Sequence, residues 1–457
     1  MGDALEVIPK LATDTGDRLS ARVRALPLTV DLVVVSVAAL ALGLIRLGGP
    51  SLWVDESFTV ADLDRPVSSY FDGYYLLFYS VMKPWTLVAG TSEWALRFPS
   101  VVGAMLSCSL LVLLGRRLFD RRIALVAGLL LATSPFMVRW SQQGRGYTMM
   151  VAVVLGATLL LLRALDRGSR GSWALYGLAF AAVMIWHPVA GLLLAAPHAV
   201  LAYQRRGRLL PHCLLAVAII LALGVTWSAQ LAMRSGEGSA IAWIEYPTLE
   251  SVGRAVLDVS GATGLGVALA SVGWFLLWRR TDRSTSVWLA VWALSPFAVA
   301  LLASLVQPIF LDRYLLVAAP AFALLGGVAL MGAQTWLRAA LVTAVVVATV
   351  AGLAEWYSVS EGGNWRGEDW RGAVAYVRGR AGGEIVVAPW WAHTAAEYYG
   401  ATVDDTSTAD AIWVLSWSET GHELPLDERT ALGFGDHVLV EEHSFGWRVT
   451  AQRWARR

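Results

Sequence analysis

The stretch that decides the fold is LPLTVDLVVVSVAALALGLIRLGGPSLWVDES, residues 26–57. Its first part, 26–45, is almost wholly apolar and is long enough for a helix that crosses the roughly 30 Å hydrocarbon core of a bilayer. It is too long for the apolar region of a signal peptide, and no small-residue cleavage site follows it. We therefore predict a membrane helix that the mature protein keeps. The chain then turns polar and carries two adjacent carboxylates, Asp55 and Glu56.

The composition of the whole chain indicates a membrane protein. Of its 457 residues, 56% are hydrophobic and 16% are charged, whereas about 25% of residues are charged in an average soluble domain. The net charge of +1 gives no basic field, so we expect no nucleic-acid partner. The two cysteines, Cys108 and Cys213, lie in apolar runs, which predicts small buried side chains and no disulfide framework.

Apolar segments of spanning length recur along most of the chain. Together they predict a polytopic α-helical membrane protein with about 11 transmembrane helices. The predicted spans are 26–46, 98–115, 122–139, 147–165, 172–186, 189–204, 211–232, 262–278, 287–306, 315–333 and 338–354.

The loop arginines predict the orientation of these spans. Clustered arginines occur in every second loop, whereas the intervening loops carry single basic residues. Because cytoplasmic loops are enriched in Lys and Arg, we expect the N-terminal tail, 1–25, to be cytoplasmic in the cell (plasma) membrane. The clustered arginines are Arg116, Arg117, Arg121 and Arg122; Arg163, Arg167 and Arg170; Arg205, Arg206 and Arg208; and Arg279, Arg280 and Arg283.

One further apolar segment, 74–90, is nearly long enough to span. If it spanned, the cluster at 116–122 would move to the outer side. Lys83 and Pro84 lie in its middle, where a lysine is costly at mid-bilayer depth and a proline breaks a helix. We therefore predict an interfacial helix on the outer face.

The last hundred residues are hydrophilic and predict a separate domain. An odd number of spans places it outside the cell. Residues 26–355 then form the transmembrane domain with an outer-face loop at 47–97, and residues 356–457 form a small extracytoplasmic α/β domain. Its predicted helices are 370–380 and 392–399, and its predicted strands are 384–389, 411–416, 437–441 and 447–453.

The charged residues of the transmembrane part gather at the predicted outer face and are nearly absent from the spans. Asp55 and Glu56 lie there beside Trp53. A partly desolvated carboxylate suits a general base, and two adjacent carboxylates could hold a divalent cation. The alternative is structural, with both acids at a helix N-terminus where the helix dipole stabilises them. The pattern alone favours neither interpretation.

A series of short motifs resembles a known family. WVDES at 53–57 precedes SEWALRFPS at 92–100, then SQQGRGY at 141–147, and RYLL at 313–316. Their order and shared side of the membrane resemble the GT-C fold glycosyltransferases, in the branch of protein O-mannosyltransferases and the lipid A aminoarabinose transferase. Two positions depart from the pattern. Gln143 stands where relatives have glutamate, and Phe71-Asp72-Gly73 stands where many have His/Lys-Pro-Pro.

The resemblance implies transfer of a sugar from a polyprenyl-phosphate donor with inversion at the anomeric carbon. Asp55 would be the base, and Glu56 would orient it or hold a cation. Arginine suits phosphate because its fork binds two oxygens. The residues that we predict at the donor phosphate are Arg145, Arg313, Tyr314, Arg97 and Lys83, and further pocket candidates are Asp72, Tyr74, Tyr75, Gln143 and His187.

Several alternatives stay open at this point. Mannose is favoured, because the start of the 74–90 segment resembles actinobacterial members described as mannosyltransferases; arabinofuranose or another sugar is the alternative. The acceptor is a glycolipid, a cell-wall glycan or a protein. A transporter or flippase of lipid-linked sugars would also explain the apolar mass, although it would usually carry ionisable residues at mid-membrane depth. A non-catalytic assembly subunit would tolerate alanine at Asp55, Arg145 and Arg313.

Overall fold

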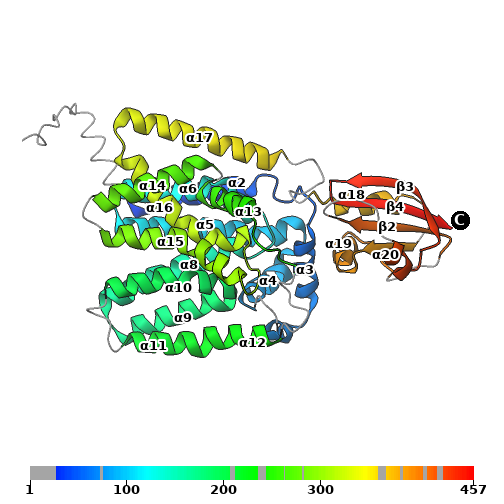
Figure 1. The fold of residues 1–457 in the computed structure, drawn as a ribbon, viewed down its shortest axis with the longest axis horizontal. Helices are drawn as coiled ribbons and strands as arrows, with labels where there is room; N and C mark the ends of the chain where they lie inside the picture. The colour runs from blue at the N-terminus through cyan, green and yellow to red at the C-terminus, as the bar shows by residue number, and fades with distance from the viewer. Residues whose placement is uncertain are drawn as a thin grey trace, which may run out of the picture.

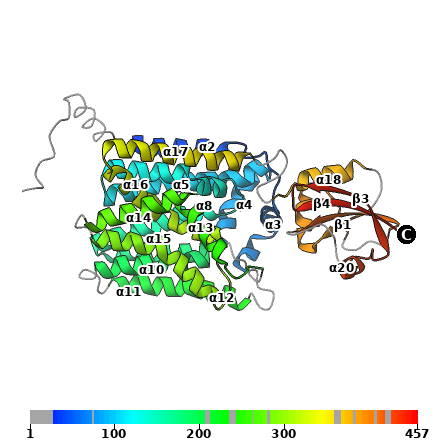
Figure 2. The same cartoon turned by 45° about the horizontal axis from the view of Figure 1, so that its top comes forward.

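The computed structural model describes residues 27–72, 76–205, 212–234, 243–261, 263–279, 283–358, 367–380, 384–404, 409–418 and 426–456. The predicted cytoplasmic tail, 1–25, lies outside the described residues, as do Arg206, Arg208 and Arg280 of the arginine clusters. Two bodies are visible, a long helical bundle and a small sheet domain at one end of it (Figures 1 and 2). We call that end of the bundle the domain-side end.

Every predicted apolar segment coincides with a helix or with a helix that is interrupted. The bundle consists of α2 (Leu28–Leu44), α5 (Glu93–Leu118), α6 (Arg121–Thr133), α7 (Pro135–Ser141), α8 (Tyr147–Arg167), α9 (Arg170–Trp186), α10 (Pro188–Gln204), α11 (Cys213–Ile219), the π-helical η3 (Ile220–Val225), α12 (Thr226–Arg234), α14 (Gly264–Arg279), α15 (Arg283–Ser304), α16 (Ala319–Gly332) and α17 (Thr335–Tyr357). The chain is thus a multi-pass helical membrane protein, as predicted.

The predicted number of eleven spans is not confirmed. Within the described residues, six helices are long and apolar enough to cross a membrane, and up to eight if each of two bent pairs counts as one span. In one of these pairs, α6 and α7 meet at an angle of 58°. Pro135 is the first residue of α7, and a proline at that position lets a new helix start while ending the previous one.

Helix α5 lies at the centre of the bundle and packs on α2, α6 and α8. Small residues permit this packing. A Cβ atom on Gly103 would approach the backbone nitrogen of Met149 to 2.7 Å, and one on Gly115 would approach the Cα of Ala124 to 2.9 Å. Close backbone approach of this kind is how helices associate where no hydrophobic effect drives them together. By contrast, α17 lies along the outside of the bundle (Figure 1).

Away from the sheet domain, the predicted arginine cluster at 116–122 is anchored by a buried acid. Asp31 of α2 is fully buried and forms ion pairs with Arg116 and Arg121. A carboxylate inside an apolar helix is tolerated when it is paired in this way.

Five short elements gather at the domain-side end. They are α3 (Val54–Asp64), η1 (Val67–Asp72), α4 (Leu76–Ala89), α13 (Leu249–Gly261) and the 3₁₀ helix η4 (Asp312–Ala318). Helix α4 covers the segment predicted to be interfacial. Its 14 residues are about 21 Å long, less than the roughly 30 Å of a bilayer core. It lies beside α3, between the bundle and the sheet domain (Figure 1).

The C-terminal domain is a four-stranded sheet of order β1-β2-β4-β3. Strand β1 (Glu384–Ala388) pairs in parallel with β2 (Ala411–Trp417), which pairs antiparallel with β4 (Val449–Arg456), and β4 pairs antiparallel with β3 (His437–Phe445). Helices α18 (Trp370–Arg378) and α19 (His393–Tyr398) match predicted helices, whereas the short η5 (Trp390–Ala392) and α20 (Leu426–Ala431) were not predicted.

The sheet domain and α3 share a hydrophobic core. Val54 and Phe58 of α3 pack with Trp370, Ala395 and other residues of the C-terminal domain. The domain is therefore docked on the helix that carries Asp55 and Glu56, and this contact links the sheet to the candidate site.

Candidate active site

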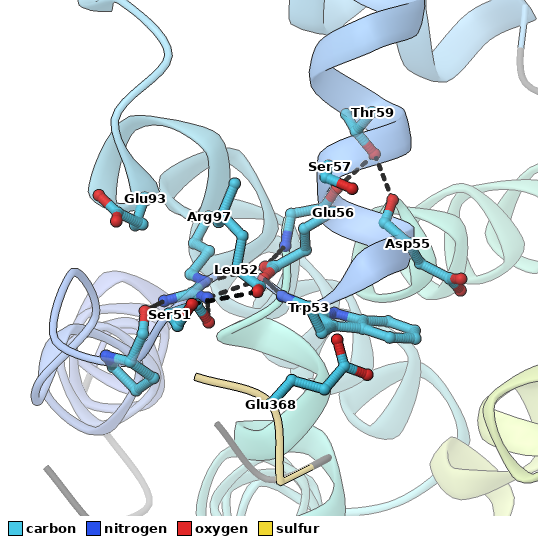
Figure 3. Close-up of polar contacts among 12 residues, drawn as sticks. Ser51, Leu52, Trp53, Asp55, Glu56, Ser57, Thr59, Glu93, Arg97 and Glu368 are labelled. Carbon is cyan, nitrogen blue, oxygen red and sulfur yellow. Dashed lines mark hydrogen bonds and ion pairs between the residues drawn. The ribbon is translucent and has the colours of Figure 1, made fainter. Parts of the chain in front are cut away.

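Glu56 and Arg97 form a fully buried ion pair at the start of α3 and of α5. Arg97 Nε lies 2.8 Å from Glu56 Oε1, and Nη2 lies 2.7 Å from Oε2. The remaining guanidinium hydrogens are donated to the backbone oxygens of Leu47, Pro50 and Ser51 (Figure 3). All five N–H donors of arginine are thereby used, so Arg97 has no donor left for the phosphate that we predicted it to bind.

Glu56 makes further hydrogen bonds within the same network. Besides the Arg97 fork, its Oε1 accepts a hydrogen bond from the Gly144 amide at 2.6 Å, and its Oε2 lies 3.4 Å from the Trp53 amide. One carboxylate therefore ties together α3, α5 and the 142–146 turn. This network gives Glu56 a positioning role, the first of the two roles that the resemblance implied, rather than that of a cation ligand.

The Asp55 side chain, unlike that of Glu56, is partly exposed to solvent. Figure 3 shows its carboxylate pointing away from that of Glu56, to the other side of α3. Its side chain is 25% exposed, and its Oδ2 lies 4.0 Å from Nη2 of Arg313, a side chain that is only 3% exposed. A partly exposed carboxylate that faces a buried guanidinium can take a proton from a molecule that enters between or beside them.

Arg313 is held in a box of aromatic rings. Its Nε donates to Tyr147 Oη at 3.1 Å. The rings of Trp140, Tyr147, Trp243 and Tyr314 lie 5.2–6.0 Å from its Cζ. Arginine is the basic residue best suited to such a site, because its weakly hydrated plane stacks on rings while its edge stays free for two-point contact with phosphate.

Arg145 supports Asp55 from the backbone side. Its Nη1 lies 3.0 Å from the Asp55 carbonyl oxygen and 3.1 Å from Thr59 Oγ1. Arg145 also lines a small cavity with Tyr147 and His187. The two arginines predicted from single loop motifs thus both converge on Asp55.

His187 and Tyr314 complete this side of the site. The His187 ring meets the Tyr314 ring edge-on with centroids 4.5 Å apart, and both are buried. His187 follows α9 and precedes Pro188, the first residue of α10. The helix junction therefore places the imidazole against the residue next to Arg313.

Other predicted residues lie elsewhere or lie outside the described part of the chain. The Lys83 ammonium donates to the Leu63 carbonyl at the end of α3, where it stabilises the negative end of the helix dipole. Gln143 is buried beside Gly144. Tyr74, Tyr75 and the side chain of Asp72 are outside the described residues.

The C-terminal domain contributes two residues that sequence analysis missed. Glu368 is buried, and its Oε2 accepts a hydrogen bond from the Val54 amide at 3.0 Å, at the positive end of α3. Tyr399 Oη accepts from the Leu52 amide at 2.7 Å. Burial raises the pKa of Tyr399 to about 12, so its phenol stays protonated at neutral pH. Neither residue belongs to one of the sequence motifs. Each contacts a residue more than 300 positions away in the chain, so the sequence alone did not indicate it.

The geometry offers little to a metal ion. Within the described residues, no group of three or more His, Cys, Asp and Glu side chains is arranged to bind one. The adjacent pair Asp55 and Glu56, which left this option open, diverges on α3 (Figure 3).

Comparisons with known proteins agree with this architecture. Residues 76–229 match the family model of dolichyl-phosphate-mannose-protein mannosyltransferases. ArnT from Cupriavidus metallidurans, solved with undecaprenyl phosphate, matches with a TM-score of 0.60 and 15% identity over 92% of this chain and 97% of ArnT. Its apo structure matches with a TM-score of 0.64 and 15% identity over 93% and 98%. No curated protein matches the chain. The chain therefore has the fold of the GT-C membrane glycosyltransferases, which confirms the resemblance seen in its motifs.

Proposed function

Since the chain has the GT-C glycosyltransferase fold, we propose that it is an inverting glycosyltransferase. It moves a sugar, with mannose favoured, from a polyprenyl-phosphate donor to an acceptor outside the cell. The observation that carries this proposal is the pairing of a partly exposed Asp55 carboxylate with the buried Arg313 guanidinium at 4.0 Å. A base for the acceptor and a cation for the leaving phosphate thus lie next to each other as an ion pair.

The chemistry follows from this pairing. The acceptor hydroxyl attacks the anomeric carbon of the donor while Asp55 takes its proton. A new bond forms between the acceptor oxygen and the anomeric carbon, and the bond to the phosphate oxygen breaks. The electron pair stays on that oxygen, polyprenyl phosphate leaves, and the attack from the opposite side inverts the anomeric centre.

The leaving phosphate gains negative charge, and preorganised donors stabilise it most effectively in a site that excludes water. Arg313 is the principal donor, because its aromatic box fixes the guanidinium before the reaction. Arg145 and Tyr314 lie close enough to assist. The Glu56–Arg97 pair keeps α3 in place so that Asp55 faces Arg313.

The donor class is supported by the relatives. ArnT binds undecaprenyl phosphate, and the matching family model is described as using dolichyl-phosphate mannose. The arginine clusters at the opposite end of the bundle support an outward-facing site, because such clusters are typical of cytoplasmic loops.

Transfer in detergent by purified protein tests the proposal. Radiolabelled polyprenyl-phosphate mannose and an envelope extract serve as donor and acceptor, with a panel of other lipid-phosphate sugars run in parallel. We expect label to reach the acceptor as polyprenyl phosphate is released. A flippase has no activity without two leaflets, so absence of transfer from every donor in the panel would favour that alternative.

A further inference from the structure

A cleft runs between α17 and the rest of the bundle at the domain-side end. Its larger cavity, which we call the upper part, has a volume of about 470 Å³ and is lined by residues of α7, α13 and α17. A second, much smaller cavity of about 50 Å³ lies next to it. Thr263 and Ala348 line both cavities, so the two cavities adjoin each other.

The two parts of this cleft differ in polarity. Arg139, Asp258 and Glu355 line the upper part, whereas no charged residue lines the second. Apolar residues such as Leu269, Phe322 and Val345 line that second part. A space that is polar at one end and apolar at the other fits an amphiphile with its head at the surface and its tail in the bilayer.

One face of helix α17 forms a wall of this cleft. Val345, Ala348, Gly352 and Trp356 recur at helical spacing and line the cleft. Ala348, Ala351 and Gly352, three small residues of α17, line the larger cavity. The opposite face of the helix is exposed and apolar; Val347, for example, is 62% exposed, as expected of a surface against lipid tails.

The charged residues of the upper part indicate which kind of head group an amphiphile bound there would have. Arg139 Nη2 lies 3.1 Å from Asp258 and 3.3 Å from Asp312, and Glu355 adds a third carboxylate on the wall. Three carboxylates against one guanidinium give this end a net negative formal charge, so it repels an anionic phosphate. Carboxylate oxygens accept hydrogen bonds from hydroxyl groups, so an uncharged, hydroxyl-rich head fits.

The head end of the cleft lies directly behind the proposed site. Arg139 and Arg313 lie over the same Trp140 ring, with their Cζ atoms 6.0 and 5.9 Å from it. Asp312, which pairs with Arg139, precedes Arg313 in the chain. A molecule seated in the cleft therefore has its head next to the residues that we propose for catalysis.

We propose that this cleft binds the acceptor, and that the acceptor is a membrane glycolipid with an uncharged sugar head and an apolar tail along α17. This inference rests on the proposed glycosyltransferase function and narrows its acceptor to one class. The polyprenyl-phosphate donor occupies the Arg313 side and does not compete for the cleft.

Photolabelling tests the proposal without relying on catalysis. The full-length protein is placed in phosphatidylcholine nanodiscs, which avoids sugar-headed detergents, and is labelled with dodecyl mannoside that carries a diazirine in its tail. We expect labelled peptides from α17 and from the 259–269 region. Ala348→Trp fills the cleft and should lower this labelling about tenfold, the loss expected when two methylene groups can no longer be buried. Val347→Trp, the matched control on the lipid-facing side, should label as the wild type does.

Three results would overturn the proposal. These are labelling of all lipid-facing helices alike, equal labelling of the two tryptophan variants, and displacement of the probe by excess polyprenyl phosphate, which would make the cleft a donor site. Asp55→Asn should label like the wild type whether or not transfer is observed. Failure of the proposed reaction is thus distinguished from failure of the acceptor site.

Discussion

Two neighbouring acids illustrate what can be predicted at the residue scale. Asp55 and Glu56 are adjacent acids in one motif, and α3 rotates each residue by about 100° from the one before it. One carboxylate consequently enters the buried Arg97 network, and the other faces Arg313. The resemblance implied Asp55 as the base and Glu56 as the residue that orients it or holds a cation, whereas the Arg97 partner of Glu56, 41 positions away, could not be predicted.

The partners of the basic residues could not be predicted either. Arg97, Lys83, Arg145 and Arg313 all occur singly in predicted outer loops, and residue type and position alone do not show which partner each one has. In the structure, Arg97 and Lys83 donate to α3 and its surroundings, whereas Arg145 and Arg313 surround Asp55.

Replacing Arg313 with lysine should lower kcat about 100-fold, the loss typical of removing one preorganised donor to developing charge. Lysine keeps the charge but not the planar fork that stacks on rings and contacts two oxygens. Initial rates with saturating donor would measure the effect. Arg117→Lys, at an exposed pair with Asp166, is the control and should leave the rate unchanged. A near-normal kcat for Arg313→Lys would remove Arg313 from the site.

Glu56→Gln should destabilise the protein by about 3 kcal/mol, because breaking a buried ion pair leaves the Arg97 charge without its partner. The folded fraction after heating in detergent measures this loss. Asp166→Asn breaks only two exposed pairs, with Arg117 and Arg205, and should change stability by about 0.5 kcal/mol or less. Equal effects of the two variants would contradict the structural role of Glu56.

At the scale of elements, the helices were predictable because long apolar runs need no tertiary information. The strands of the C-terminal domain were predictable from alternation, although β3 is longer than predicted and reaches Phe445. The break between α6 and α7 and the docking of α3 on the sheet domain were not predicted. The first is a local effect of Pro135, and the second depends on packing between distant segments.

Glu368 connects these elements, so its loss should weaken the alignment of α3. We expect Glu368→Gln to lower kcat about tenfold, since small displacements of catalytic groups cost rate steeply. Steady-state kinetics measure the effect. Glu397→Gln, half-exposed on α19, is the matched control within the same domain. An unchanged kcat for Glu368→Gln would show that the domain does not position Asp55.

At the scale of the whole molecule, the predicted orientation can be tested by labelling. In a background without Cys108 and Cys213, a cysteine at Thr91 lies at the domain-side end, and one at Gly171 lies at the start of α9, at the opposite end. Both positions are exposed. We expect a membrane-impermeant maleimide to label Thr91→Cys in intact cells and Gly171→Cys only after permeabilisation. The reverse pattern would place the site in the cytoplasm.

The central claim is that Asp55 is the base of a sugar transfer from a lipid phosphate. The most direct measurement compares wild type with Asp55→Asn, which keeps the shape of the side chain but cannot take a proton. Transfer of labelled mannose from polyprenyl phosphate should fall by about 10² to 10⁴, the usual contribution of a general base, with the folded fraction unchanged. Turnover by Asp55→Asn at the wild-type rate would contradict the account.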